Sequence, residues 1–428
     1  MPGKFKAAVL PIAMFIVASL FYWYEFLLRV LPSPMYAQLM LEYDIDATKL
    51  GYLFSSYFLS YAFLQLLAGL WTDRLGPRRL LTIAVLLCAF STLIFAHTSS
   101  FVLVCLARFF IGAGSAFAFV SCMKIVNIWF KPSVFPVLSG LTLTIGSLGA
   151  VSGVAYVSIA LQSLAWRELS AYLGYFGIVL AVLTWLLIRD EKKVGDGDSS
   201  KQKSDKTSDK SFVECLQDVL HSRQCWIVAL YGSLTTAPTD AIGGLWAVPY
   251  LEQVHGLSNE LASSAASKLF VGMAVGSPLL AFLSNYFNNR KYIMYMSSIM
   301  ASICLFMFCL MPSISYISAS LLCFFAGVFG AYVMCFVVIN DISDAKHIAT
   351  SVGFVNMVCM LGSVLLSAAM GIGMDLVSSY LGLQVTGRIY SQVVYQLVLS
   401  TAPLLYALSA LIVIPSIKES FDKDKYNQ

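Results

Sequence analysis

The sequence is a series of long apolar segments separated by short polar ones. Twelve of these segments approach or exceed about 20 mostly apolar residues, the length needed to cross about 30 Å of hydrocarbon. Only helices and closed barrels satisfy all backbone hydrogen bonds in lipid, and runs this long favour helices. We therefore predict an all-α polytopic membrane protein with twelve transmembrane helices. The predicted spans are residues 7–40, 50–72, 79–97, 100–126, 134–162, 168–188, 224–250, 260–286, 291–311, 313–340, 348–376 and 390–414.

One long polar segment, residues 189–211, divides the spans into two groups of six, and its composition is typical of a flexible charged linker. Short motifs recur in both groups at a nearly constant offset, for example RFFIG at 108–112 and CFFAG at 323–327. Such a parallel repeat places a binding site between the two halves, near the bilayer midplane. The predicted domains are two pseudo-symmetric six-helix bundles, residues 1–188 and 224–414. A cytoplasmic charged linker, residues 189–223, joins them, and a cytoplasmic tail, residues 415–428, follows.

Charge refines this picture. Only 12% of the residues are charged, against about 25% in soluble proteins. With the N-terminus inside, 20 of the 27 Lys and Arg residues fall in cytoplasmic loops and tails. This asymmetry predicts a multi-pass protein of the cell's inner membrane with both termini cytoplasmic. The basic linker is then a topology signal, and we expect no nucleic-acid partner.

The ten cysteines show no metal-type spacing, and the four histidines form no set with a partner carboxylate. We therefore expect no metal, no cofactor and no enzymatic activity. A channel would need a continuous polar pore, whereas the polar residues cluster at one depth. Parallel repeats with a site between them are typical of transporters, so we expect a transporter, and we expect it to be monomeric.

The segment GLWTDRLGPRR, residues 69–79, resembles the loop 2–3 motif of the major facilitator superfamily. With twelve helices and the repeat, this resemblance spans the whole chain. We interpret the motif as a cytoplasmic gate whose Asp meets a helix N-terminus and whose Arg residues meet carboxylates or helix C-termini when the inner side closes. The alternative is a positive-inside tight turn. The predicted gate residues are Gly69, Asp73, Arg74, Gly76, Arg78, Arg79 and, from the second half, Arg290, for which Asp341 and Asp344 are candidate partners.

Two shorter segments, YEFLLRVLPSPM in the first span and GLWAVPYL at 244–251, resemble the phagosomal nutrient transporters of intracellular bacteria. Members of that group take up amino acids and nucleosides. The fifth span lacks the Gly-Pro pair typical of proton-driven drug exporters, which argues against drug export.

Charged side chains within spans are costly and mark candidate functional sites. At about 1.5 Å per residue, Arg29, Arg108, Asp240 and Lys268 lie at a similar depth, about half-way through the bilayer. The position that matches Arg108 in the second half is Cys323, so the fold does not require an arginine there. We predict that Arg108 binds an anionic group of the substrate; the alternative is a structural pair with a carboxylate such as Glu25.

Glu25 and Arg29 share one helix face, four residues apart. They either pair only with each other, or Glu25 is the proton-coupling site and Arg29 binds substrate. Asp240 lies in a segment interrupted by Pro and Gly, and could hold a substrate ammonium, take the coupling proton or form a clamp with Lys268. Further candidates for substrate binding are Tyr22, Tyr24 and Asn356.

The sequence thus predicts a secondary active transporter that works by alternating access. Charges of both signs in one layer suit a zwitterion, so an amino acid is the first substrate class, taken up with a proton. The alternative is a uniporter or exchanger for carboxylates or nucleosides, in which Glu25→Gln and Asp240→Asn would leave the pH dependence unchanged.

Overall fold

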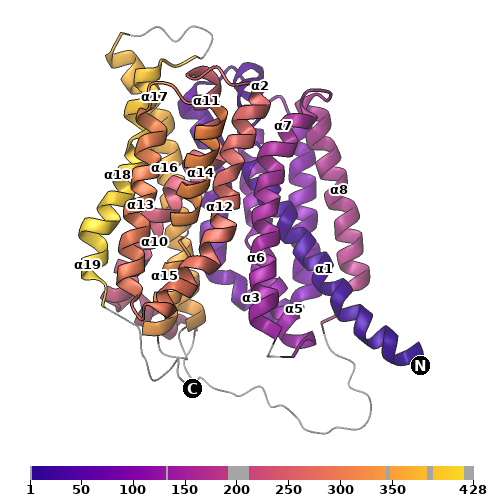
Figure 1. The fold of residues 1–428 in the computed structure, drawn as a ribbon. Helices are drawn as coiled ribbons and strands as arrows, with labels where there is room; N and C mark the ends of the chain where they lie inside the picture. Colours follow the sequence, from indigo (N-terminus) through magenta and orange to yellow (C-terminus); the bar gives the residue numbers. More distant parts are fainter. Residues whose placement is uncertain are drawn as a thin grey trace.

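The computed structural model describes residues 2–131, 134–190, 212–330, 332–343, 348–382 and 389–418. Figure 1 shows two bundles of long helices that stand side by side. The first bundle comprises α1 (Pro2–Val30), α2 (Tyr36–Glu42), α3 (Ala47–His97), α4 (Phe101–Ser115), α5 (Ala118–Trp129), α6 (Phe135–Val151), η2 (Ser152–Tyr156), α7 (Val157–Ala160) and α8 (Trp166–Leu187). The second comprises α9 (Phe212–His221), α10 (Arg223–Pro238), η3 (Thr239–Trp246), α11 (Ala247–Gln253), α12 (Asn259–Tyr286), α13 (Arg290–Leu310), α14 (Tyr316–Phe329), α15 (Val333–Ile342), α16 (Ile348–Tyr380), α17 (Gln392–Leu399), α18 (Thr401–Leu408), η5 (Ser409–Val413) and α19 (Ile414–Ser416).

The predicted spans are present as helices. Within the described residues, eleven helical segments are long and apolar enough to cross a membrane. The remaining predicted span, residues 224–250, consists of α10, η3 and α11 in direct succession. The all-helical, twelve-span prediction is confirmed, with the seventh span wound partly as a π-helix.

Polar side chains at the span boundaries determine where several helices begin. In each case the side chain of the residue before the helix accepts a hydrogen bond from a backbone N–H of the first turn, which would otherwise lack a partner. These capping residues are Asp46, Ser222, Ser258, Asn289, Ser315 and Ser391.

The predicted first span, residues 7–40, is wrong at its end. The helix α1 stops at Val30, a turn follows, and α2 begins at Tyr36. Pro32 and Pro34 explain the break, because proline has no N–H to continue the helix and disfavours a helical conformation in the preceding residue. The turn places Ser33 and its neighbours between the two bundles.

The predicted linker, 189–223, also needs correction at its end, since residues 212–221 form α9, which packs against α16. Residues 191–211 lie outside the described part of the chain. So do most of the predicted tail and Asp344.

The internal repeat is visible in helix packing. Gly112 on α4 lies against the backbone carbonyl of Tyr57 on α3, so closely that a Cβ would overlap its oxygen. Gly327 on α14, the matching position in the second half, lies against the carbonyl of Leu269 on α12 in the same way. The repeated motif therefore marks a repeated helix–helix contact.

The two bundles meet along α3 with α16 and along α6 with α12. We call the end of the molecule that carries α2 and α11 the outer end, in keeping with the orientation predicted from the charges. The end where α1 begins is the inner end (Figure 1). Several hydrogen bonds near the outer end join the bundles, among them Ser33 to the carbonyl of Leu245 (3.5 Å) and Asn259 to the carbonyl of Pro34 (3.1 Å).

Candidate functional site

A buried ion pair lies on α1, midway along the bundle. One terminal nitrogen of Arg29 is 3.3 Å from Oε2 of Glu25, and the two residues are 4% and 0% exposed. Their spacing of four residues places both side chains on one helix face. The predicted pairing of Glu25 and Arg29 is therefore present.

The helix α3 supplies the third member of this cluster. The hydroxyl of Tyr57 donates to Oε2 of Glu25 at 2.7 Å and accepts from Nε of Arg29 at 3.4 Å. The Arg29 guanidinium also lies over the rings of Phe26 and Tyr61, at 4.1 and 5.0 Å from their centroids. Arg29 is thus held by a carboxylate, a hydroxyl and aromatic faces, partners that stabilise a buried cation.

Arg108 on α4 makes contacts that the sequence did not predict. Its terminal nitrogens donate to the main-chain carbonyls of Leu28 (2.5 Å) and Arg29 (2.8 Å), and its guanidinium lies 5.0 Å from the ring centroid of Tyr57. These carbonyls belong to the last turn of α1, where no intrahelical donor remains. The predicted alternative, a pair between Arg108 and Glu25, is wrong; Arg108 instead caps the end of the helix that carries Glu25.

Asp240 comes from the second bundle. It occupies the first turn of η3, is 7% exposed, and accepts a hydrogen bond of 2.7 Å from Ser363 on α16. Its carboxylate is close enough to interact with the charge of Arg29, which belongs to the other half. Charges from both halves therefore meet in one central layer, as the depths of Arg29 and Asp240 predicted.

The predicted clamp between Asp240 and Lys268 is absent from the described residues. Lys268 is partly exposed on α12 and lies near Tyr316, at the outer start of α14. The similar depth predicted for the two residues therefore does not bring them into contact. The assignment of Lys268 to substrate binding remains a prediction.

The other predicted side chains separate into two groups. Tyr22 is buried beside Phe26, within electrostatic range of Glu25 and Tyr61. Tyr24 points away, because its hydroxyl donates to the carbonyl of Leu173 on α8 at 2.9 Å.

Asn356 lies on α16, two turns toward the inner end from Ser363, and is half-buried. Its spacing of seven residues from Ser363 places it on the face that carries the Asp240 contact.

Four further residues of this layer were not predicted from the sequence, namely Tyr57, Tyr61, Tyr332 and Ser363. Tyr332, which precedes α15, lies within electrostatic range of Arg29 and Asp240. A pattern could have indicated two of the others, since Tyr57, Tyr61 and Gln65 recur every four residues and form a polar stripe along an apolar span.

At the inner end, the loop 2–3 motif is tied to its own half. Gly76 adopts a positive φ of 75°, which glycine tolerates, and α3 bends there. Asp190 then accepts from the backbone N–H of Arg78 at 2.8 Å, while Nε of Arg78 donates to the carbonyl of Trp185 at 2.9 Å. The bend is as predicted, and Arg78 joins the ends of two helices of the first bundle.

The other gate residues give a mixed result. Arg74 and Arg79 are exposed, Gly69 approaches no neighbour closely, and the side chain of Asp73 lies outside the described part of the structure. In the second half, Arg290 and Asp341 form a buried ion pair with an Nε–Oδ2 distance of 3.1 Å. This contact was predicted, but it lies within one bundle.

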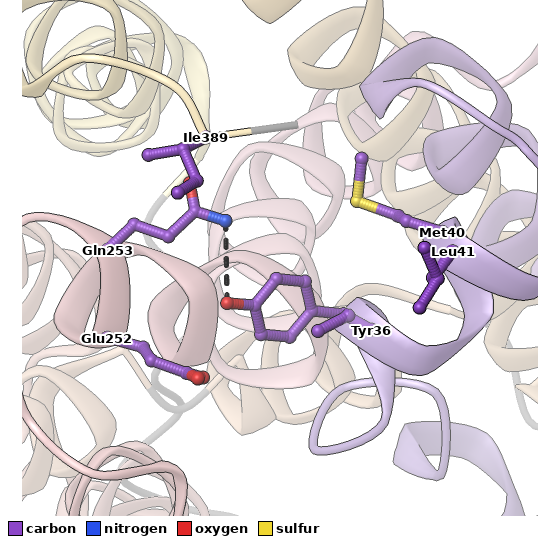
Figure 2. A pocket seen from close by; sticks show the side chains of 7 residues that line it. Tyr36, Met40, Leu41, Glu252, Gln253 and Ile389 are labelled. Atoms are coloured by element: carbon purple, nitrogen blue, oxygen red, sulfur yellow. Dashed lines mark hydrogen bonds between the residues drawn. The ribbon is translucent and has the colours of Figure 1, made fainter. Parts of the chain in front are cut away.

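A depression of about 470 Å³ lies at the outer end, between α2 and the end of α11. Figure 2 shows the side chains that line it. Tyr36 faces Gln253 across it, and the amide of Gln253 donates to the Tyr36 hydroxyl at 3.4 Å. Burial raises the pKa of Tyr36, so this hydroxyl keeps its proton at neutral pH. The depression lies apart from the central charges and marks where the halves touch.

The sequence profile of the Major Facilitator Superfamily matches residues 14–367. The chain therefore belongs to this superfamily. It is a multi-pass membrane protein of this superfamily.

The chain is similar to several transporters. An uncharacterized transporter of Bacillus subtilis is 28% identical over 144 residues, 34% of this chain and 33% of that protein. A probable sulfoacetate transporter of Cupriavidus necator is 23% identical over 289 residues, 64% of this chain and 65% of that protein. The chain thus spans less than two thirds of these two relatives. The hexuronate transporter of Bacillus subtilis is 22% identical over 365 residues, 80% of this chain and 82% of that protein.

Solved structures agree on the fold. A bacterial homologue of the human lysosomal transporter Spinster, in an inward-facing and unoccupied conformation, has a TM-score of 0.78 at 15% identity, covering 95% of this chain and 97% of that chain. A mutant nucleoside transporter has a TM-score of 0.74 at 13% identity, covering 95% of this chain and 100% of that chain. At these identities the likeness shows the fold alone.

Proposed function

We propose that the protein moves a small organic carboxylate by alternating access, together with a proton. One observation carries this proposal: the Glu25–Arg29 pair, fully enclosed at the interface of the two halves and held by Tyr57. The names of two similar proteins, a sulfoacetate and a hexuronate transporter, support an anionic substrate.

The pair defines a binding step. A substrate carboxylate offers Arg29 the same acceptor geometry as Glu25, so it can replace Glu25 as the partner of the guanidinium. The rings of Phe26 and Tyr61 hold the guanidinium in place during this exchange. The guanidinium therefore keeps a carboxylate partner throughout the exchange, and the cost of the step falls on Glu25.

The same step implies proton uptake. When all four groups are ionised, Glu25 and Asp240 balance Arg29 and Arg108 in the central layer. A substrate anion adds one negative charge, and Glu25 loses its cationic partner. A carboxylate without a partner is costly in an interior of low polarity, so Glu25 binds a proton as the substrate arrives.

A second candidate substrate is an amino acid, and Asp240 favours it. The two carboxylates lie on opposite halves, Glu25 on α1 and Asp240 on η3. A zwitterion could therefore join Arg29 through its carboxylate and Asp240 through its ammonium. Such a substrate would draw the two halves together, as alternating access requires.

For the cellular setting we propose uptake across the inner membrane by a monomer, with both termini cytoplasmic. The charge asymmetry of the loops supports this orientation. The hydrogen bonds that join the halves near the outer end support a conformation closed on that side.

The experiment uses purified protein in proteoliposomes with an imposed pH gradient. Uptake is measured for D-glucuronate, sulfoacetate, L-alanine and uridine. The variants are Glu25→Gln and Asp240→Asn, and Glu168→Gln, which changes an exposed glutamate on α8, is the matched control.

We expect gradient-driven uptake of a carboxylate, loss of the gradient dependence in Glu25→Gln and no change in Glu168→Gln. Transport that responds equally to pH in all variants would favour a uniporter or exchanger instead. Uptake of L-alanine that depends on Asp240 would select the amino acid, and uptake of uridine alone would overturn both substrate classes.

A further inference from the structure

One carboxylate at the outer end, far from the central charges, joins the two halves. Oδ2 of Asp375 on α16 accepts from the backbone N–H of Thr48 at 2.8 Å and from its hydroxyl at 2.5 Å. Thr48 lies in the first turn of α3, in the other bundle. Oδ1 of Asp375 accepts from the hydroxyl of Tyr390 at 2.5 Å.

Further hydrogen bonds extend this contact to neighbouring elements. The backbone N–H of Ala47 donates to the Tyr390 hydroxyl at 3.1 Å, again across the interface. The backbone N–H of Tyr390 donates to Oε1 of Gln253 at 3.1 Å, and Gln253 reaches Tyr36 on α2. Burial, with Asp375 beside it, raises the pKa of Tyr390, so its hydroxyl remains a donor at physiological pH.

The contact uses the N-terminus of α3. The first backbone N–H groups of a helix lack intrahelical partners and carry partial positive charge. Asp46, in the same half, caps the N–H of Lys49 at 2.8 Å. Asp375 caps the N–H of Thr48 from the opposite half, so this cap exists only while the halves touch.

Close backbone packing of α3 against α16 lies next to the Asp375 carboxylate, so its hydrogen bonds form only when these two helices are in contact. Gly51 on α3 lies against the main chain of Ser367 on α16, and Gly371 on α16 lies against Ala47 on α3. A small separation of the two helices would break these contacts and the hydrogen bonds of Asp375 together. The hydrogen bonds of Asp375 and the backbone contacts between α3 and α16 therefore form and break together.

We propose that Asp375 is the latch of the outer gate: its carboxylate holds α16 on the N-terminus of α3, and outward opening requires its release. This inference rests on the alternating access proposed above. The latch is defined as Asp375, Thr48 and Tyr390.

The test measures the separation of the halves at each end of the molecule, without any substrate. Purified protein in lipid nanodiscs carries spin labels at Leu41 and Tyr380, exposed positions at the outer end on opposite halves. A second sample carries labels at Leu75 and Tyr286, exposed positions at the inner end. Cys105, the native cysteine that is not fully buried, is replaced by serine.

The latch variant is Asp375→Asn, which keeps the shape and removes the charge. The matched control is Asp46→Asn, which changes an aspartate at the same helix end whose hydrogen bond among the described residues is to Lys49 of its own half. We expect Asp375→Asn to raise the ratio of open to closed outer ends by about tenfold or more, the effect of losing a charged hydrogen-bond acceptor. Asp46→Asn should leave the distances unchanged.

Thr48→Val provides a second route, because it removes the hydroxyl donor and leaves the backbone N–H in place. It should give a smaller shift in the same direction. Unchanged outer distances in both Asp375→Asn and Thr48→Val would overturn the latch.

The pair of labels at the inner end distinguishes the latch from the proposal of alternating access. If Asp375→Asn opens the outer end and closes the inner one, both the latch and alternating access are supported. If it opens the outer end while the inner distance stays constant, the latch stands and alternating access is contradicted.

Discussion

The guanidinium of Arg108 on α4 donates to the main-chain carbonyl of Arg29 on α1, at an Nη2–O distance of 2.8 Å. Two arginines of like charge are therefore neighbours in the centre of the bundle. The contact uses the backbone of Arg29, while the Arg29 side chain turns toward Glu25. Arg108 thus completes the helix end, and Arg29 pairs with the carboxylate that our proposal exchanges for substrate.

We therefore expect a loss of stability to be the main effect of substituting Arg108. In Arg108→Gln, two buried carbonyl groups lose donors, and we expect a loss of about 2 to 5 kcal/mol in the free energy of unfolding. Arg108→Lys, which can still donate to these oxygens, should recover part of it. Thermal unfolding in detergent measures the change.

A matched control is Arg167→Gln. Arg167 also donates to main-chain carbonyls, those of Ala96 and Thr98 at the end of α3, but its side chain is 28% exposed. Water can replace it, so the loss should be clearly smaller. Equal losses in the two variants would contradict the importance of burial at Arg108.

The Tyr57 hydroxyl should matter for transport rather than for folding. Tyr57→Phe removes the donor to Glu25 and the acceptor for Arg29, so it should alter the dependence of uptake on the pH gradient. The measurement is gradient-driven uptake of D-glucuronate in proteoliposomes.

Tyr24→Phe is the comparison for Tyr57→Phe, because Tyr24 is similarly buried. The substitution removes one hydrogen bond, to a carbonyl on α8. Its gradient dependence should equal that of the unmodified protein. If the two variants behaved alike, the assignment of Tyr57 to the central cluster would be wrong.

Gly112→Ala should displace α4 from α3. The new Cβ would overlap the carbonyl oxygen of Tyr57, a rigid backbone atom, so we expect destabilisation of about 1–3 kcal/mol. Gly69→Ala, in open space on the same α3 helix, should be neutral or slightly stabilising. Thermal unfolding of both variants checks the prediction.

His255, in the outer loop before α12, should make stability depend on pH. Its Nδ1 accepts from the backbone N–H of Ile314 at 3.3 Å, and burial lowers its pKa. The folded state therefore favours the neutral ring, so stability falls as the pH decreases below about 6.5, the ordinary value in the unfolded chain.

The measurement for His255 is the difference in unfolding temperature between neutral and mildly acidic pH. His255→Gln should reduce this difference, while His97→Gln, which changes an exposed histidine at the end of α3, should not. A constant difference across all three proteins would show that His255 does not contribute.

The spans, the repeat and the approximate depth of the charges could all be predicted from residue type and spacing. Hydrocarbon thickness requires about 20 apolar residues per helix, so spans can be counted from composition alone. A fixed rise of about 1.5 Å per residue converts position into depth, which placed Arg29, Arg108 and Asp240 in one layer. The pair of Glu25 and Arg29 could be predicted because both residues belong to one helix.

Tertiary structure decided which charges touch. Depth does not determine the direction in which a helix face points, so Lys268 and Asp240, which were predicted at a similar depth, form no ion pair among the described residues. Likewise, only packing brought Arg108 to the end of α1 and Asp375 to Thr48. These contacts join residues far apart in the chain, and the rotation of each helix is determined by the neighbours that it packs against.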